Sequence, residues 1–135
     1  MTSSGLDIEV LGIDMLVPDA PTALEVCELC VLALASAGID EGHMAVEFVE
    51  ADRIQVLNRE YRNIDSPTDV LSFGVDEDGD SAGPRELGDI VICPEHTTDL
   101  REAVVHGTLH LTGMDHEVDD GEMLALQAEL MRWVR

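Results

Sequence analysis

The stretch HGTLHLTGMDH, residues 106–116, places three histidines at the spacing of a metal site. His106 and His110 are four residues apart, so on a helix they lie on one face, about 5–6 Å from each other. Gly113 can adopt the left-handed conformation that ends a helix and turns His116 back toward the same point. Three protein ligands leave one tetrahedral position for water, as in catalytic zinc sites. We therefore predict one Zn²⁺ per chain, bound by His106, His110 and His116.

The chain around these histidines is apolar. No acidic or basic side chain other than histidine occurs in residues 103–114, which predicts a central buried helix. Asp99 followed by Glu102 forms a capping-box-like start, so we expect this helix to begin there and to reach Thr112. An unpaired buried polar group costs about 1–3 kcal/mol, and a shared metal would satisfy both imidazoles.

One position separates this pattern from the metzincin proteases, whose motif is HExxHxxGxxH. Those enzymes use the Glu after the first His as general base. This chain has Gly107 there, which can neither accept a proton nor orient a water molecule. Peptide hydrolysis by that route is therefore not expected.

The motif instead resembles the HGxLHLxGyDH signature of the YbeY family, bacterial endoribonucleases implicated in rRNA maturation. Residues 57–73, LNREYRNIDSPTDVLSF, are similar to the family's LNxxYRxxDxPTDVLSF segment, and residues 87–94, LGDIVICP, resemble the strand that follows it. With the later EMLALQAEL helix, the similarity spans roughly residues 46–130. The resemblance implies an α/β fold, a zinc held by three histidines and cleavage of single-stranded RNA. The chain departs from the family in having only twelve residues between Cys93 and His106.

The resemblance also places Arg62 in the family's active cleft. A phosphodiester needs positive charge near the oxygens that gain charge in the transition state. We therefore assign Arg62 and His106 as catalytic residues. The alternative for Arg62 is a surface salt bridge with Asp65 or Glu60.

Other polar residues leave two interpretations open. Three of them lie on a predicted strand beside Arg62 and would either receive extended substrate or serve the structure: Thr68, Asp69 and Ser72. Asp115 would either orient His116 or stabilise the turn near Gly113. The remaining histidines, His43 and His96, are expected at the surface.

Composition indicates one globular domain over residues 1–135. Apolar residues make up 45% of the chain and aromatic residues only 3%, which predicts an aliphatic core. The polar residues 1–5 are not a signal peptide, and no apolar run approaches the ~20 residues that span a bilayer. We expect a cytoplasmic protein without a membrane partner. Three cysteines do not make a disulfide framework, and the CxxC pair Cys27 and Cys30 lies in an apolar helical run, so we expect both in the core.

The formal charge of −22 is unusual for a protein whose substrate would be a polyanion. It comes from 29 acidic residues against seven arginines, with no lysine. Two explanations stay open: a solvated acidic shell adapted to high salt, which we favour, or a surface for basic proteins.

The fold class predicted from these patterns is α/β (α+β), with a small mixed sheet of about four strands packed with helices. We expect strands over residues 6–15, 44–49, 68–75 and 87–93, helices over residues 22–37 and 52–61 and from Asp99 to Thr112, a loop over residues 76–85, and a last helix capped by Asp119 or Asp120. In that last helix, the residues expected to face inward are Met123, Leu126, Leu130 and Val134. In the helix over residues 52–61, Ile54, Leu57 and Tyr61 follow one another at spacings of three and four, so we expect this helix to pack on the preceding strand through these side chains.

Three functions are compatible with this reasoning. The first is a zinc-dependent, single-strand-specific endoribonuclease in rRNA maturation and ribosome quality control, acting alone or with ribosomal proteins and not on DNA. The second is a metal hydrolase on a non-RNA substrate. The third is a non-enzymatic ribosome-assembly factor that zinc stabilises. The nucleophile, a zinc-bound water or the ribose 2′-hydroxyl, also stays open.

Overall fold

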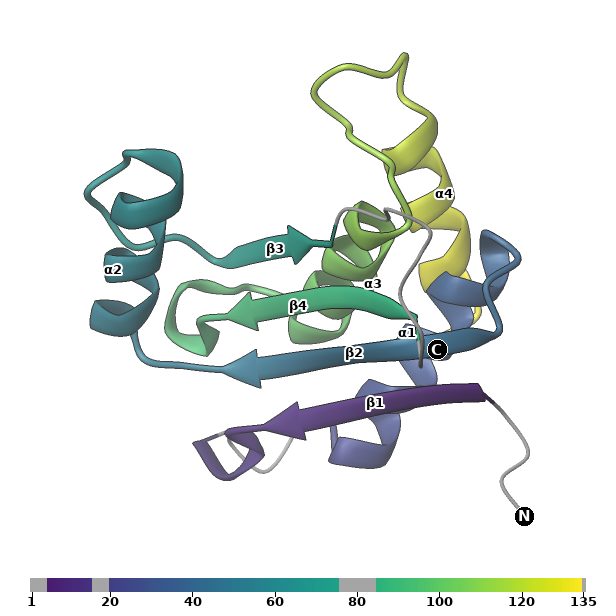
Figure 1. Ribbon diagram of the computed structural model, residues 1–135, viewed down its shortest axis with the longest axis horizontal. Coiled ribbons are helices and arrows are strands. Elements are labelled where there is room, and N and C mark those ends of the chain that lie inside the picture. Colours follow the sequence, from purple (N-terminus) through teal and green to yellow (C-terminus); the bar gives the residue numbers. More distant parts are fainter. Residues whose placement is uncertain (1–4, 16–19, 76–84, 135) are drawn as a thin grey trace.

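The computed structural model describes residues 5–15, 20–75 and 85–134. Within these ranges the chain forms four strands and four α-helices (Figure 1): β1 (Gly5–Leu11), α1 (Ala23–Ser36), β2 (Glu41–Phe48), α2 (Ala51–Arg62), β3 (Val70–Gly74), β4 (Glu86–Ile92), α3 (Leu100–Leu111) and α4 (Glu122–Arg132). Two short 3₁₀ turns, η1 (Ile13–Met15) and η2 (Pro94–His96), follow β1 and β4.

The four strands form one mixed sheet in the order β1-β2-β4-β3. β1 pairs with β2 and β2 with β4 in parallel, whereas β3 pairs antiparallel to β4 (Figure 1). This confirms the predicted small mixed sheet packed with helices. It also places β3 at one edge of the sheet. The loop expected between β3 and β4 lies largely outside the described residues.

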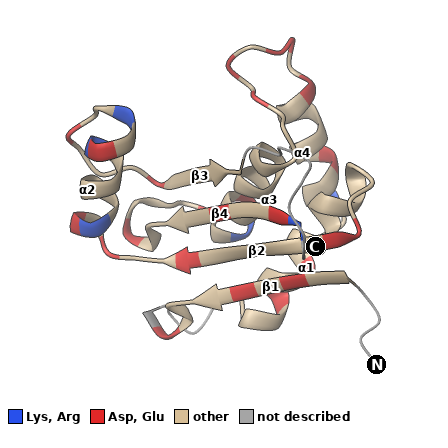
Figure 2. Ribbon diagram, viewed as in Figure 1, with Lys and Arg blue, Asp and Glu red and all other residues tan. Residues whose placement is uncertain are grey.

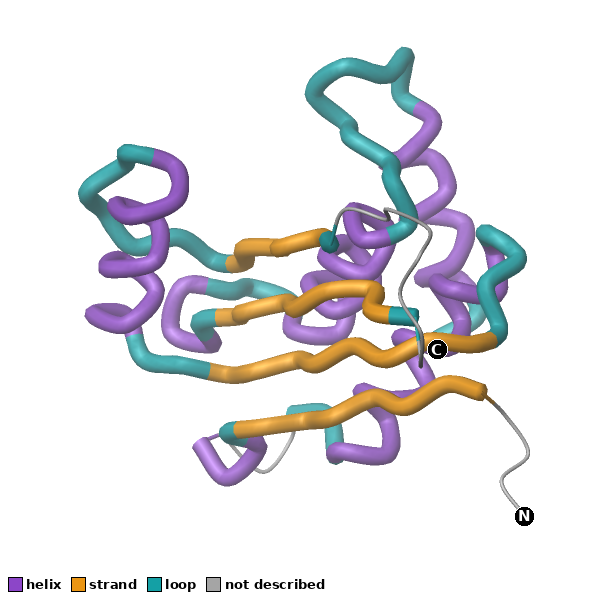
Figure 3. The backbone as a smooth tube through the Cα atoms, in the orientation of Figure 1, coloured by secondary structure: helices purple, strands orange, loops and turns teal. Residues whose placement is uncertain are grey.

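Helices α1, α3 and α4 cover one face of the sheet, as the tube in Figure 3 shows. The larger hydrophobic core lies between them and the strands. β2 contributes Met44, Val46 and Phe48 to this core, and β4 contributes Ile90 and Ile92. Since side chains of a strand alternate between faces, these alternate positions all point toward the helices.

Helix α2 packs separately, against the other face at the ends of β3 and β4. Its Ile54 and Leu57 join Leu71 of β3 and Val91 of β4 in a second buried cluster. The prediction that this helix packs on the preceding strand, with Tyr61 on the inner face, is therefore wrong. Tyr61 is 66% exposed, and its ring meets Phe73 edge-on with centroids 5.2 Å apart.

Helix α3 occupies the predicted place, and three contacts fix its position. Asp99 caps its first turn by accepting a hydrogen bond from the N–H of Glu102 at 3.1 Å. The Arg101 guanidinium bonds both carboxylate oxygens of Glu25 on α1, at 2.5 and 3.0 Å, and it lowers the pKa of that carboxyl. Gly107 lies so close to β4 that a Cβ there would be 2.7 Å from Ile90 Cγ2. Helix α3 therefore packs directly against β4 of the sheet at Gly107.

Several element boundaries differ from the sequence-based expectations. β1 ends at Leu11 rather than residue 15, because Gly12 has φ +75° and lies against the carbonyl of Phe48, where any Cβ would clash. β2 begins earlier, at Glu41. The cap position of α4 is Gly121, but the Asp119 carboxylate still accepts from the N–H groups of Gly121 and Met123.

The inward stripe expected on α4 is largely confirmed. Met123 and Leu130 are buried, Leu126 and Val134 are partly buried against the same core, and Met131 is buried as well.

The part of the sheet's second face that α2 leaves open is acidic, as Figure 2 shows along β1. His43 lies there between two carboxylates, at 2.9 Å from Glu9 and 3.0 Å from Glu86. The sequence predicts His43 at the surface, whereas its side chain is partly buried between these two carboxylates. In the described ranges, no helix combines the length and apolarity needed to cross a bilayer.

Of the CxxC pair, Cys30 lies in the core as predicted and Cys27 is partly buried. Burial raises the pKa of the Cys30 thiol to about 12, so it stays protonated and unreactive.

Candidate metal centre

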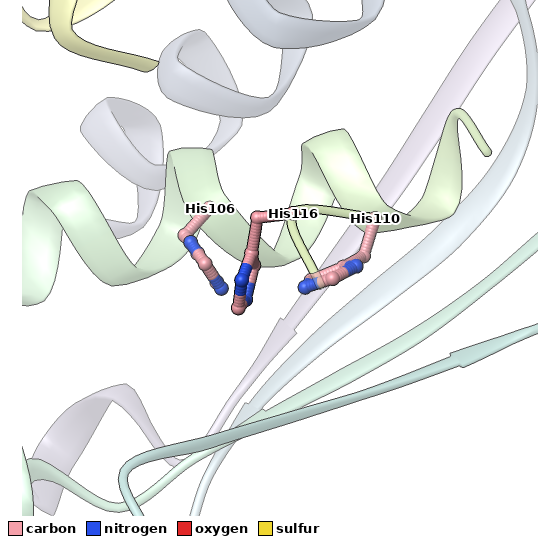
Figure 4. A group of neighbouring side chains, drawn as sticks. All are labelled: His106, His110 and His116. Carbon is pink, nitrogen blue, oxygen red and sulfur yellow. The ribbon is translucent and has the colours of Figure 1, made fainter. Parts of the chain in front are cut away.

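Helix α3 and the loop after it bring the three predicted histidines together. His106 and His110 project from one face of α3, and His116 reaches back to them from the loop between α3 and α4 (Figure 4). The ring centroids lie 4.8 to 5.3 Å apart. One ring nitrogen from each residue can be chosen so that all three lie within 4.8 Å of one another. Gly113, with φ +104°, supplies the left-handed residue that the turn needs.

Hydrogen bonds orient the two helical imidazoles. His110 Nδ1 lies 3.0 Å from the carbonyl oxygen of Met114, which can only accept, so Nδ1 carries the proton. His106 Nδ1 lies 2.7 Å from Oε1 of Gln127 on α4. In both residues Nε2 is left with a free lone pair. This is the arrangement that metal-binding histidines show when their second nitrogen is hydrogen-bonded.

Electrostatics favour the neutral form of His110. Burial and, after it, the neighbouring His106 lower the pKa of His110 below its usual value. A histidine must be neutral to bind a metal. Three imidazoles in a convergent group are a donor set that fits a transition-metal ion such as zinc.

The histidines open onto a cleft of about 850 Å³. Its other walls come from the end of α2, from β3 and from the loop after α3, which are far apart in the sequence. Arg62, the last residue of α2, lines this cleft. Its guanidinium has no ion-pair partner among the described residues; it is Arg59 that lies 3.7 Å from Asp65. The surface salt bridge considered for Arg62 is thus made by its neighbour.

The polar residues beside Arg62 also line the cleft, but two of them lie before the strand rather than on it. The Asp69 carboxylate accepts from the N–H of Val70 at 2.8 Å and from the Thr68 hydroxyl at 3.2 Å. Ser72, on β3, donates to the carbonyl of Gly107 at 3.1 Å and so ties the strand to α3. All three side chains therefore have structural hydrogen bonds at the wall of the cleft.

Among the described strands β3 pairs only with β4, and its other edge, here called the outer edge of β3, faces this cleft. The N–H of Cys93 donates to the Asp69 carbonyl, and Leu71 pairs with Val91, so the backbone groups of odd-numbered residues point to β4. The backbone groups of Ser72 and Gly74 consequently point away from the sheet, along the cleft wall.

Of the two roles considered for Asp115, its hydrogen bonds fit stabilisation of the turn that follows Gly113. Its carboxylate accepts from the N–H of Glu117 at 2.9 Å, and its carbonyl accepts from Val118 and Asp119. In the described part of the chain, no hydrogen bond joins it to His116. His96 is exposed at η2, as expected.

Sequence reasoning missed Gln127, whose side chain contacts His106. A signal was available, because Gln127 follows Met123 by four residues and precedes Leu130 by three, and both are buried on the inner face of α4. A polar residue at that position needs a buried polar partner. Tyr61 also lines the cleft, whereas its helical spacing predicts a place on the buried face of α2.

The chain is similar to known proteins over most of its length. The family model described as Endoribonuclease YbeY matches residues 21–135, a longer stretch than the motifs alone indicated. The chain is 46% identical to the Endoribonuclease YbeY of Rubrobacter xylanophilus, over 80% of this chain and 82% of that protein. It is 38% identical to that of Macrococcus caseolyticus, over 84% and 86%.

A solved structure is also similar. The solution structure of a Thermotoga maritima protein superposes with a TM-score of 0.53 at 30% identity, covering 94% of this chain and 88% of that one. The shared fold extends across the strands and helices that carry the cleft.

Proposed function

Because this chain belongs to the YbeY family of endoribonucleases, we propose that it is a zinc-dependent endoribonuclease that cleaves single-stranded RNA. We further propose that it acts in rRNA maturation and ribosome quality control in the cytoplasm, with ribosomal proteins as candidate partners. Arg62 and His106 are the proposed catalytic residues, and His106, His110 and His116 the proposed zinc ligands.

One observation carries this proposal: a convergent group of three histidines shares a cleft with an arginine that has no ion-pair partner among the described residues. In a chain with 29 acidic residues and seven arginines, most cations near a surface would meet a carboxylate. An arginine that pairs with no carboxylate keeps its N–H donors available for an anionic ligand. The family membership makes that ligand RNA.

Each side chain has a distinct part in this function. His106, His110 and His116 would hold the ion, and a zinc bound there supplies Lewis acidity to a phosphoryl oxygen and eases deprotonation of an attacking oxygen. Arg62 offers a planar fork of N–H donors to the non-bridging oxygens of a phosphodiester as their charge grows. No protein carboxylate is needed as general base, which is consistent with glycine at position 107.

The outer edge of β3, which pairs with no other described strand, suits an extended single strand of RNA. Its outward N–H groups, at Ser72 and Gly74, are neutral donors that can bind phosphate oxygens without lysine. Double-stranded RNA is recognised mostly by shape and by contacts across its wide minor groove, whereas an unpaired strand can lie extended along such an edge. The cleft therefore favours single-stranded over double-stranded RNA.

The first test compares the wild type with His110→Ala on single-stranded RNA. We expect cleavage by the zinc-loaded wild type and loss of cleavage in His110→Ala, with the far-ultraviolet circular dichroism unchanged. A zinc-loaded wild type that cleaves no RNA would favour the non-enzymatic assembly factor instead. Equal cleavage by both proteins would exclude the histidines from catalysis.

The second test uses two arginines of the same helix. Arg62→Ala should lower the rate of cleavage about 100-fold, the usual cost of removing one donor to a developing oxyanion, and Arg62→Lys should recover little of it. Arg53→Ala is the matched control, because Arg53 is also exposed on α2 but lines a different pocket, on the open face of the sheet. Equal rates for Arg62→Ala and Arg53→Ala would assign Arg62 to the surface.

A further inference from the structure

Helix α4 contacts the histidine group through the side chain of Gln127, which lies beside His106. We propose that Gln127 is a positioning residue for the metal centre: its side-chain oxygen holds His106 in the tautomer that carries the proton on Nδ1 and presents the Nε2 lone pair to the ion. The inference rests on the proposed metal site, and it assigns to the C-terminal helix a control over metal affinity.

The geometry supports a directed hydrogen bond. Gln127 Oε1 lies 2.7 Å from His106 Nδ1, a short distance for an N–H···O bond. Both side chains are partly buried, so bulk water does not freely replace this contact. A neutral imidazole has one N–H and one lone pair, and an acceptor at Nδ1 therefore fixes the lone pair at Nε2.

His110 provides an internal comparison. Its Nδ1 faces the carbonyl of Met114, a backbone acceptor that no substitution removes and no rotation converts to a donor. The two helical ligands are thus oriented in the same sense, one by the backbone and one by a side chain. Only the second depends on the identity of a residue, and that residue comes from another helix.

The choice of glutamine also matters electrostatically. Gln127 and His106 border a cavity of about 230 Å³ that is also lined by Asp69, Asp99 and Glu102. A carboxylate at position 127 would add a fourth negative charge beside these three. An uncharged amide accepts the hydrogen bond from His106 Nδ1 without that repulsion.

The polar cavity beside Gln127 limits the loss of zinc affinity that we expect when the amide is removed. When the amide oxygen is removed, a water in this polar cavity can accept from His106 Nδ1 in part. Loss of a hydrogen-bond partner behind a metal-binding histidine weakens metal affinity by about 10- to 100-fold. We expect Gln127→Leu to lie near the lower end, about tenfold weaker for zinc.

The test measures zinc affinity by competition with a chromophoric chelator, with zinc as the only added ligand. Gln127→Leu should bind about tenfold more weakly, whereas Gln127→Glu, which keeps the acceptor, should stay within about threefold of the wild type or bind more tightly. Gln55→Leu is the matched control, because Gln55 bonds Asp65 on the surface and should leave the affinity unchanged. Wild-type affinity in Gln127→Leu, or an equal loss in Gln127→Glu, would overturn the proposal.

A second readout needs no metal. Long-range ¹H–¹⁵N spectra of the zinc-free protein, recorded about two pH units above the usual histidine pKa, report which ring nitrogen of His106 carries the proton. We expect Nδ1–H in the wild type and a shift toward Nε2–H in Gln127→Leu, with His110 unchanged. The same tautomer in both proteins would refute the role of Gln127. A wild type that shows the predicted tautomer but binds no zinc would refute the metal centre and leave the positioning contact standing.

Discussion

Replacing Gly107 with alanine tests how α3 is held against the sheet. An added Cβ would lie 2.7 Å from Ile90 Cγ2, 3.2 Å from Ile90 Cδ1 and 3.2 Å from the Ser72 hydroxyl oxygen. Ile90 is fully buried, so its branched side chain has little room to move. Overpacking of this kind costs about 1–3 kcal/mol, whereas alanine for glycine within a helix contributes about 1 kcal/mol of stability. The net expectation is a loss of about 0–2 kcal/mol in the free energy of unfolding.

A double-mutant cycle isolates the contact from the helix propensity. Ile90→Ala alone should cost about 2–5 kcal/mol, but it removes both methyl groups that the new Cβ would meet. Gly107→Ala combined with Ile90→Ala should therefore be at least about 1 kcal/mol more stable than the sum of the single effects predicts. Ile54 is a matched control, because it is an equally buried isoleucine on α2, in the separate second cluster.

Urea unfolding in the presence of a chelator measures these values without a contribution from bound metal. If Gly107→Ala raises the stability by the full ~1 kcal/mol of helix propensity, the close approach of α3 to β4 is contradicted. Additivity of Gly107→Ala with Ile90→Ala within about 0.3–0.5 kcal/mol, as expected for the Ile54→Ala control, would contradict it as well.

Two further predictions concern charge. Hydrogen bonds to Glu86 and then Glu9 raise the pKa of His43 to about 9, above an unfolded value of about 6.5, so its stabilising contribution is complete below about pH 6.5 and is lost as the pH rises through about 9. Thermal unfolding should show a melting temperature that falls across this window more in the wild type than in His43→Gln, and parallel curves would count against the bridge. The melting temperature and the RNA affinity should both rise with salt, because a net charge of −22 repels itself and RNA across a Debye length of ~30 Å at about 0.01 M, shortened to ~3 Å at 1 M. A flat melting temperature together with cleavage that falls steadily with salt would instead indicate a local basic patch or a basic partner that delivers the RNA.

The convergence of the three histidines could be predicted from the sequence because the residues that produce it lie close together along the chain. His106 and His110 are related by the period of one helix, and Gly113 and His116 follow within six residues, so no long-range contact has to be inferred. The Asp99 cap of α3 was accessible for the same reason. The number and approximate positions of the strands also followed from alternation and from turn residues, whereas their order in the sheet did not.

The features that could not be predicted from the sequence depend on contacts between segments that are distant along the chain. Tyr61 fits the helical stripe of α2, yet it lies exposed near the end of that helix, with its ring edge-on to Phe73 of β3. Gly12 reads as an interruption within an apolar run, and only the carbonyl of Phe48 explains why the strand ends there. The partner of His106 lies 21 residues away on another helix, and no local pattern connects the two.

The most direct test of the metal centre is elemental analysis of purified wild type and of three single variants, His106→Ala, His110→Ala and His116→Ala. We predict one zinc per chain in the wild type and loss of the ion from each variant, because removing one of three protein ligands leaves a site too weak to retain it. His96→Ala, at an exposed histidine outside the cleft, serves as the control and should keep its zinc. Full stoichiometric metal in all three triad variants would contradict the assignment.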